Sequence, residues 1–125
     1  MIYTTYFENL KNLPKHITPI AICLKSPEWY RGLEYKRLAP HDSFFRKWKA
    51  NHNNNYYITC FNQQVLQNLT VEEVIEDLNA LMKSTNDNDI ALVCYELPDE
   101  FCHRHLVSQW LNKHNVSCIE WEDIT

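Results

Sequence analysis

Residues 90–105 read IALVCYELPDEFCHRH, and within these letters one structural pattern gives way to another. The opening IALVCYE is almost entirely apolar, as in a strand that other layers cover on both faces of a sheet. A short polar loop follows, and from about residue 100 to residue 113 apolar side chains recur at helical spacing. The stretch therefore predicts a strand, a loop and a helix, with two cysteines and two histidines gathered near the junction.

The rest of the chain alternates strand and helix patterns in the same way. Strand patterns, rich in β-branched and aromatic residues, occupy IYTTY (2–6), ITPIAICL (17–24) and the segment 116–121. Thr70 and Glu73 have the spacing of a capping box and open the most distinct helix pattern, which runs to Met82. Strands that alternate with helices predict an α/β fold, a small and mostly parallel sheet flanked by helices, in a single compact domain over residues 1–125.

Two further helices are expected between residues 42 and 69. Asp42 or Ser43 is placed to cap the first, which would run through Trp48. A polar NHNNN turn, residues 51–55, would separate it from a second helix with apolar side chains at helical spacing. By contrast, residues 26–42 are rich in proline and charge, so they predict a long loop without a regular element.

The composition limits the classes of function. With 45% apolar and 22% charged residues over 125 positions, the chain is typical of one globular domain. A formal net charge of -4 argues against a surface that coats nucleic acid in general. No apolar run approaches about eighteen residues and no signal-peptide pattern opens the chain, so we expect no membrane partner and a cytoplasmic location. The five cysteines at irregular spacing fit reduced thiols. A single glycine excludes both kinds of glycine-rich phosphate loop, so any phosphate site must be built otherwise. We expect no cofactor.

The junction after the apolar strand is the candidate site. In open α/β sheets, ligands bind beyond the carboxyl ends of the strands, where helix N-termini present unpaired amides. With Asp99 as the expected N-cap, Cys102 falls in the first helical turn, where the helix dipole, His103 and Arg104 would favour the thiolate. Cys102 is therefore the candidate nucleophile.

Neighbouring residues offer the other groups that such chemistry needs. Glu96, at the exit of the strand, is placed as a general base or as a partner for a ribose or amine group. Arg104 offers a planar fork for a phosphate or carboxylate. His103 and His105 are candidates for proton transfer.

Each of these residues also has a purely structural interpretation. Cys94 lies inside the apolar strand, and free cysteine is among the most buried residue types. Cys102 fits an inert neighbour of a helix cap, and His103 fits a hydrogen-bonded histidine at the edge of the core. Cysteine and histidine also suit zinc, but the spacing of Cys94, Cys102, His103 and His105 matches no common zinc module, so we predict no metal site.

Aromatic and basic residues share the expected loop before residue 42. Trp29 and Tyr30 stand close in the sequence to Lys25 and Lys36, a combination suited to stacking on a base and holding a phosphate. The alternative is that Trp29 and Tyr30 only seal the sheet. Loops that combine Trp, Tyr and Arg also serve as interaction surfaces for proteins.

Three segments together carry a family resemblance: residues 1–22, PEWYRGLEYKRLAP (27–40) and VCYELPDEFCHRHLVSQWL (93–111). They resemble the family named domain of unknown function 488, over nearly the whole chain. The most specific part is the C-terminal signature, C-[YF]-E followed by a short loop and C-H-R. The resemblance implies a compact α/β domain with a cleft at these motifs, found in bacteria and phages, and implies no particular reaction.

The resemblance also implies a set of site residues. Six come from the C-terminal motifs and two segments would form a lid or wall: Cys94, Tyr95, Glu96, Cys102, His103, Arg104, Trp29-Tyr30 and Tyr35-Lys36. Relatives often carry an arginine after the second strand, in a stretch like I-A-R-W-T-P, where this chain has Lys25 in ICLKSP. If that arginine binds an anion, Lys25 replaces it here as a point charge, or the contact is lost.

These observations favour a small enzyme, a hydrolase or transferase, that acts on a nucleotide or another phosphate-bearing molecule. Arg104 and Lys25 would hold the anion, Tyr95 and the aromatic loop would contact the ligand, and Glu96 with Cys102 or a histidine would supply the chemistry. Two alternatives stay open: a non-catalytic phage or bacterial accessory module that sequesters a nucleotide signal or binds a host protein, and a Cys/His metal-binding protein. Four tryptophans and seven tyrosines also leave room for a homodimer.

Overall fold

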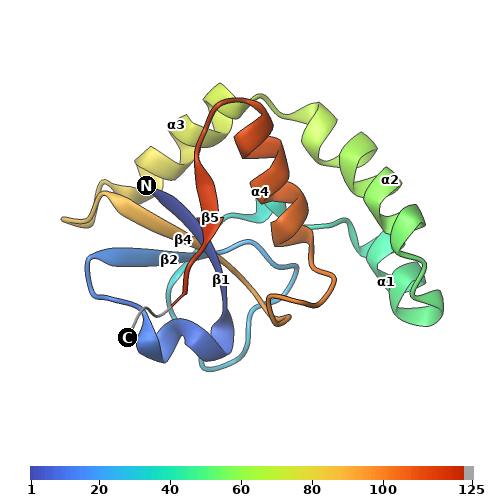
Figure 1. Cartoon of the computed structure of the whole chain (residues 1–125), viewed down its shortest axis with the longest axis horizontal. Helices are drawn as coiled ribbons and strands as arrows, with labels where there is room; N and C mark the ends of the chain where they lie inside the picture. Colours follow the sequence, from blue (N-terminus) through green and yellow to red (C-terminus); the bar gives the residue numbers. More distant parts are fainter. Residues whose placement is uncertain (123–125) are drawn as a thin grey trace.

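The computed structural model describes residues 1–122 and has a five-stranded sheet at its centre (Figure 1). All strand pairs are parallel, and the strand order is β3-β2-β4-β1-β5. The strands are β1 (Ile2–Tyr6), β2 (Ile17–Ala21), β3 (Leu33–Glu34), β4 (Asp89–Cys94) and β5 (Cys118–Glu120). The α/β fold with a parallel sheet is thereby confirmed.

Four α-helices and three short 3-10 helices connect the strands within the described residues. They are η1 (Phe7–Asn12), η2 (Lys36–Leu38), α1 (Asp42–Asn51), α2 (Asn54–Gln64), η3 (Leu66–Asn68), α3 (Val71–Met82) and α4 (His103–Lys113). Helices α3 and α4 lie on one side of the sheet and η1 on the other, while α1 and α2 form a pair beside the sheet (Figure 1). No helix in this part of the chain has the length and apolar character needed to cross a membrane.

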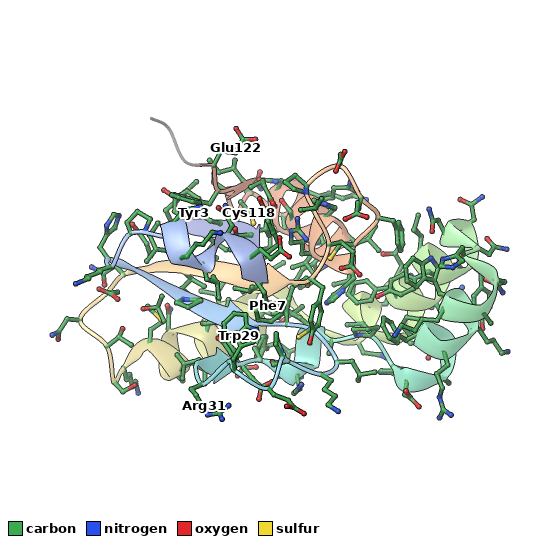
Figure 2. The ribbon with its side chains drawn as sticks, turned by 90° about the horizontal axis from the view of Figure 1, so that it is seen from below. Tyr3, Phe7, Trp29, Arg31, Cys118 and Glu122 are labelled. Carbon is green, nitrogen blue, oxygen red and sulfur yellow. The ribbon has the colours of Figure 1, made fainter. Side chains whose placement is uncertain are left out.

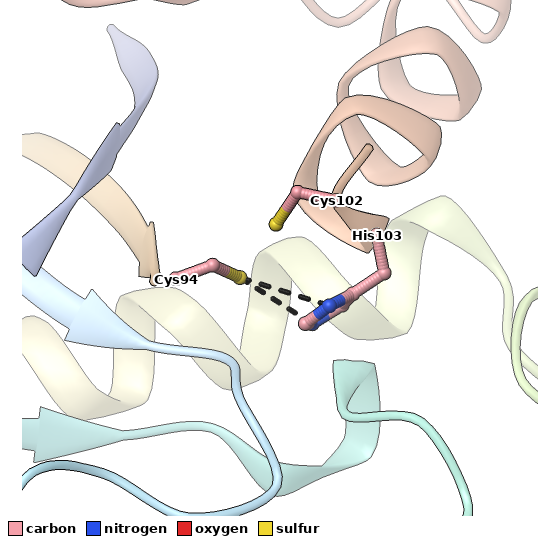
Figure 3. A group of neighbouring side chains, drawn as sticks. All are labelled: Cys94, Cys102 and His103. Carbon is pink, nitrogen blue, oxygen red and sulfur yellow. Dashed lines mark hydrogen bonds between the residues drawn. The ribbon is translucent and has the colours of Figure 1, made fainter. Parts of the chain in front are cut away.

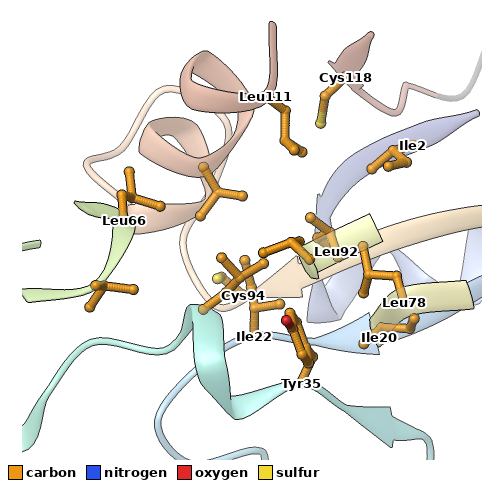
Figure 4. Packing of buried hydrophobic residues seen from close by; sticks show 14 of the residues in the cluster. Ile2, Ile20, Ile22, Tyr35, Leu66, Leu78, Leu92, Cys94, Leu111 and Cys118 are labelled. Atoms are coloured by element: carbon orange, nitrogen blue, oxygen red, sulfur yellow. The ribbon is translucent and has the colours of Figure 1, made fainter. Parts of the chain in front are cut away.

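Both faces of the central strands are buried, which explains the unbroken apolar run of β4. Ile20 and Leu92 face the larger core, where they pack with side chains of α3 and α4 such as Leu78 (Figure 4). Their chain neighbours Ala21 and Val93 point to the opposite face, because side chains alternate along a strand, and pack there with Phe7 and other residues. A strand covered on both faces keeps no polar side.

The strand register brings the carboxyl ends of three strands to one edge of the sheet. Tyr6 at the end of β1 is level with Cys94 at the end of β4, and Ala21 at the end of β2 is level with Val93. The segments that follow these three strands therefore start side by side, at the edge where parallel sheets bind ligands.

The capping box is confirmed, but two other predicted caps are wrong. The Thr70 hydroxyl accepts a hydrogen bond from the Glu73 amide at 3.2 Å, and the Glu73 carboxylate accepts one from the Thr70 amide at 2.7 Å. Helix α1 has His41 as its N-cap, and Asp42 lies inside the helix, where it pairs with Arg46 one turn later. An acid in the first turn still complements the helix dipole.

The predicted N-cap Asp99 of α4 is also wrong, because residues 97–100 form a turn of their own. The Glu100 carboxylate accepts from the Leu97 amide at 2.9 Å, and the Glu100 amide donates to the Leu97 carbonyl at 3.0 Å. Helix α4 therefore begins at His103, and Cys102 is its N-cap rather than a first-turn residue.

Several predicted segments have different bounds in the structure; the strand expected over residues 116–121, for example, spans only Cys118–Glu120. The strand expected over residues 17–24 ends at Ala21, although the Ile22 amide still bonds to the carbonyl of Val93 at 3.1 Å. The region expected to lack regular structure contains the two-residue strand β3, which pairs with β2, and the 3-10 helix η2. Such short elements are below the length at which residue patterns become readable.

Candidate active site

A cavity of about 430 Å³ opens at the carboxyl edge of the sheet. Segments after β2 and β4 and the start of α4 form one side, and helices α1 and α2 form the other. The lining residues are Cys23, Leu24, Lys25, Pro40, Phe45, Trp48, Lys49, Tyr57, Cys94, Tyr95, Glu96, Phe101, Cys102 and His103. The candidate junction predicted from sequence is thus one wall of this cavity.

Two cysteines and a histidine form a buried cluster in that wall (Figure 3). Cys94 ends β4, whereas Cys102 and His103 come from the start of α4. The Cys94 sulfur lies 3.5 Å from Nε2 and 3.7 Å from Nδ1 of His103, and the thiols and the imidazole all lie within 4.8 Å of one another. The cluster holds groups that can exchange protons among themselves.

A backbone carbonyl fixes the imidazole ring of His103. Nε2 of His103 lies 2.7 Å from the carbonyl oxygen of Ile22, which follows β2. Because a carbonyl only accepts, Nε2 carries a proton and donates it there. Nδ1 is then the nitrogen that is available to accept a proton from a thiol. A catalytic cysteine–histidine pair needs a ring nitrogen available in this way.

The environment of Cys102 favours its thiolate. Burial alone would raise the pKa of this thiol, but hydrogen bonds from Cys94 and His103 and the positive charges of His103 and Arg104 outweigh it and lower the pKa well below its usual range. Burial and the hydrogen bond to Cys102 raise the pKa of Cys94. The two pKa values shift in opposite directions, so Cys102 is the cysteine of the pair that loses its proton more readily.

Glu96 is a second perturbed group in the same wall. Burial, followed by the negative charge of Cys102 and a hydrogen bond to it, raises the pKa of Glu96 to about 7. A carboxyl group with such a pKa is populated both with and without its proton near neutral pH, as acid/base catalysis requires.

Arg104 has partners that its sequence context does not suggest. Its side chain is fully buried, its Nε and one terminal nitrogen donate to the two carboxylate oxygens of Glu120 at 3.1 and 2.9 Å, and the other terminal nitrogen donates to the Glu96 carbonyl at 2.6 Å. Glu120 also accepts from the Thr4 hydroxyl at 2.7 Å, and the Tyr6 ring lies 5.9 Å from the guanidinium. Arg104 does not line the cavity, so the expected direct contact with an anion has no support from this arrangement.

The wall opposite the cluster consists of aromatic residues that the sequence analysis missed. The Trp48 and Tyr57 rings of α1 and α2 lie 5.6 and 5.0 Å from the ring of Phe101, and Phe45 lines the same wall. Phe45, Trp48 and Lys49 have i, i+3, i+4 spacing, so they share one face of α1. That spacing was a usable signal in the sequence, but it does not say which way the face points.

Two lysines, Lys25 and Lys49, line the cavity and take part in no ion pair within residues 1–122. By contrast, Lys36 pairs with Glu34 at 3.1 Å. The ammonium group of Lys49 lies 5.3 Å from the centre of the Phe45 ring. The cavity therefore combines aromatic rings with two ammonium groups that are not held in ion pairs within residues 1–122.

The structure assembles part of the predicted site. Of the residues predicted to bind ligand, Lys25 and Tyr95 line the cavity, but Trp29, Tyr30 and Lys36 do not. The Tyr30 hydroxyl donates to the Leu33 carbonyl at 2.6 Å, so this ring helps to seal the sheet. Lys36 donates to the carbonyls of Leu24 and Cys23 at 2.6 and 3.2 Å and so supports the segment that follows β2.

His105 lies apart from the other predicted catalytic residues. It does not line the cavity, and its Nε2 is buried without a hydrogen-bond partner in the described part of the chain. His103, Cys102 and Glu96 do line the cavity together.

The buried cluster offers three side chains of the types that bind zinc. Two thiolates and one imidazole within 4.8 Å resemble the three protein ligands of catalytic zinc, which leave a fourth position open. The bond from His103 to the Ile22 carbonyl is also an orientation common among metal-bound histidines. The absence of a metal stays a prediction from the sequence spacing.

Comparison with known families identifies the class of protein. A family model described as the active DUF488-N3 subclade matches residues 6–115, which include every residue of the buried cluster and the aromatic wall. The chain therefore belongs to the DUF488 family, within this subclade, as the C-Y-E and C-H-R motifs predicted. Neither the curated proteins nor the solved structures include a significant match to it.

Proposed function

We propose that this chain is an enzyme of the hydrolase or transferase kind that binds a nucleotide, or another phosphate-bearing ligand, in the cavity. One juxtaposition carries the proposal: the cluster of Cys94, Cys102 and His103 faces the same cavity as an aromatic wall and two lysines without acidic partners among residues 1–122. The matched subclade is described as active, which agrees with a catalytic role.

The binding half of the proposal follows from shape and charge. Aromatic faces such as that of Trp48 favour a planar apolar group such as a base, and stacking of this kind tolerates any base. Lys25 and Lys49 would supply the charge for a phosphate as point charges. An aromatic cavity with unpaired lysines suits a ligand that carries a planar ring and an anion together.

The catalytic half assigns Cys102 as nucleophile and Glu96 as acid/base. The Cys102 thiolate forms a bond to the electrophilic atom of the ligand while the bond to the leaving group breaks, and the leaving group takes the proton of Glu96. The Glu96 carboxylate then removes a proton from water, or from an acceptor hydroxyl in a transferase. The resulting oxygen attacks the intermediate, and the thiolate of Cys102 leaves unchanged.

We assign Arg104 a positioning role in place of direct contact with the ligand. Its bond to the Glu96 carbonyl fixes the backbone next to the acid/base, and its charge is one of the causes that lower the pKa of Cys102. Glu120 holds the guanidinium from the other side.

The experiment that tests catalysis compares a ligand before and after contact with the protein. Nucleotides that stabilise the protein are incubated with wild type, Cys102→Ser and Glu96→Gln, recovered after denaturation and weighed by mass spectrometry. The proposal predicts a changed ligand with wild type and an intact ligand with both variants. Cys60→Ser, a buried cysteine on α2 outside the cavity, is the control and should turn over ligand like wild type.

The same experiment separates the enzyme from a sequestering module. A bacterial or phage accessory protein that captures a nucleotide signal would return its ligand intact from wild type as well. A protein that serves only to bind a host protein would show no nucleotide stabilisation at all.

A metal-dependent enzyme is the second candidate, favoured by the compact Cys94, Cys102 and His103 donor set. It predicts stoichiometric zinc in the purified protein and loss of that zinc in both Cys94→Ser and His103→Ala. Metal-free protein with full activity would exclude it.

We also propose a reducing compartment such as the cytoplasm as the place of action. All five cysteines are free and buried, although Cys94 and Cys102 lie close together. Free thiols in such an arrangement persist where glutathione and thioredoxin keep them reduced.

A further inference from the structure

A second aromatic cluster lies next to the cavity at the same edge of the sheet. Phe7, directly after β1, is the buried centre of this cluster, and the rings of Trp29 and Tyr95 pack against it at 5.9 and 4.9 Å (Figure 2 labels Phe7 and Trp29). Tyr95 also lines the cavity, so the cluster and the cavity share a side chain. The aromatic surface thus continues from the cavity to the outside.

The two outer rings are exposed yet held in place. Trp29 is 62% and Tyr95 47% exposed, and both are among the largest exposed apolar side chains of the described chain. The Tyr95 hydroxyl donates to the Lys25 carbonyl at 2.5 Å, and Trp29 meets Phe7 edge to face at 86°. Exposed aromatic rings that are already ordered lose little entropy when a planar group stacks on them.

Lys25 connects the two aromatic surfaces. Its backbone is bonded to Tyr95, its side chain is exposed, and it lines the cavity. It has no ion-pair partner among residues 1–122. Lys25 and Tyr95 thus line the cavity, Tyr95 is hydrogen bonded to Lys25, and Tyr95 and Trp29 both pack on Phe7, so the cavity, the lysine and the exposed aromatic platform are linked by shared contacts.

From these contacts we propose that the platform of Trp29 and Tyr95 is a second base subsite, and that the ligand contains two bases joined through phosphate. One base occupies the cavity, the linking phosphate lies beside Lys25, and the second base stacks on Trp29. Such a unit occurs in a free dinucleotide and at the end of a single nucleic acid strand. The inference rests on the proposed nucleotide site and names its substrate class.

The net charge of -4 fits this narrow mode of binding better than a long nucleic acid track. A long single-strand groove needs a line of lysines and arginines, with binding that depends strongly on salt. A two-base unit needs only the few charges that the cavity and its mouth provide.

The test measures binding of matched ligands by isothermal titration. The probes are the four 5′-phosphorylated mononucleotides, the corresponding 5′-phosphorylated homodinucleotides and an eight-residue single strand of each, in ribose and deoxyribose forms. We expect at least one dinucleotide to bind about 5- to 150-fold more tightly than its mononucleotide, the range that one stacked base supplies. Cys102→Ser protein keeps the ligands intact during the titration.

Variants at position 29 separate stacking from general apolar contact. Trp29→Ala and Trp29→Leu should remove the advantage of the dinucleotide and leave mononucleotide binding unchanged, whereas Trp29→Phe should keep most of it. Ile119→Ala, which removes another exposed apolar side chain but lies on β5, is the control and should change neither affinity.

The outcomes distinguish failure of this inference from failure of the proposed function. The second subsite alone would be overturned if mononucleotides bound as tightly as dinucleotides, or if Trp29→Ala did not change dinucleotide binding. The platform would then be left for a protein partner. No binding of either class would overturn both. If a dinucleotide binds more tightly than its mononucleotide, the octanucleotide shows which ligand carries the two-base unit. An octanucleotide that binds with the same affinity as the dinucleotide identifies the end of a nucleic acid strand. An octanucleotide that does not bind identifies the free dinucleotide.

Discussion

Replacement of Arg104 by alanine should destabilise the protein strongly, even though the residue sits in a motif that looks catalytic. The guanidinium is 0% exposed and makes three charge-assisted or carbonyl hydrogen bonds, two of them to Glu120. Its loss leaves the Glu120 carboxylate with only the Thr4 hydroxyl as a donor and removes the donor to the Glu96 carbonyl.

The loss of stability depends on how well water can replace the guanidinium as the partner of Glu120. Removing one member of a buried ion pair typically costs about 3–5 kcal/mol. The Glu120 side chain is 18% exposed and keeps the bond from Thr4, so we expect the lower end, about 3 kcal/mol. In a domain of this size that corresponds to a fall in Tm of about 10–15 °C.

The assay is urea and thermal unfolding followed by circular dichroism, with Arg37→Ala as the matched control. Arg37 also faces two carboxylates, at 2.9 Å from Asp77 and 3.4 Å from Glu73, but it is exposed. Arg37→Ala should therefore change stability far less, because water and salt screen exposed pairs. The double variant Arg104→Met/Glu120→Leu should regain at least half of the loss, because it leaves no buried charge.

Equal effects of Arg104→Ala and Arg37→Ala would refute this reasoning and return Arg104 to the list of groups that meet the ligand. Loss of binding in Arg104→Ala cannot be read as loss of a ligand contact unless the variant is folded at the assay temperature.

Three further predictions concern single groups. Iodoacetamide should alkylate Cys102 at pH values where ordinary thiols are protonated. It should spare Cys118, because burial raises the pKa of that thiol. Peptide mass mapping across pH measures both rates, and equal alkylation rates at Cys102 and Cys118 would contradict the prediction. Glu96 holds its proton more tightly when folded, with a pKa of about 7, so its contribution to stability falls as pH rises from about 4.5 to 7. Glu96→Gln should accordingly gain stability relative to wild type over that window, by at most about 3 kcal/mol in unfolding titrations, and a constant difference would exclude the raised pKa. Thr70→Ala should cost about 1 kcal/mol through loss of the capping bond to Glu73, measured by thermal unfolding, with unchanged stability as the contrary result.

Elements specified by local chemistry were predictable from the sequence. The capping box at Thr70 acts between residues three apart in the sequence. The unbroken apolar run of β4 indicates by itself that both faces of the strand are buried. The alternation of strands and helices then leaves few topologies, of which the parallel sheet is the usual one. The ends of the helices were less predictable, because they depend on competing local hydrogen bonds. The Glu100 carboxylate, for example, accepts from the Leu97 amide, and α4 starts later than expected.

The candidate site was predictable only where one segment supplies it. Cys94, Glu96, Cys102 and His103 lie within ten residues of one another, and the junction between strand and helix gathers them. The aromatic wall around Trp48 comes from a helix pair distant in the sequence, and its orientation is a tertiary property.

The partners of Arg104 were also not predictable from the residues next to it in the sequence. Its sequence neighbours suggested a ligand contact, but its main partner is Glu120 on β5, and pairing of β5 with β1 in the sheet helps to bring it there. A side chain that reaches a partner through the sheet leaves no signal in a local motif.

The central claim is that a phosphate-bearing ligand binds in the cavity beside Lys25 and Lys49, and ligand-induced thermal stabilisation tests it most directly. The measurement screens nucleotides, dinucleotides and inorganic phosphate against wild type, Lys25→Ala/Lys49→Ala and a control with exposed lysines outside the cavity removed, Lys15→Ala/Lys83→Ala. A ligand at about a hundred times its dissociation constant adds roughly 2.7 kcal/mol of stability. We predict such a shift for wild type and the control and its loss in the cavity variant. An equal shift in all three proteins, or none in any, would contradict the claim.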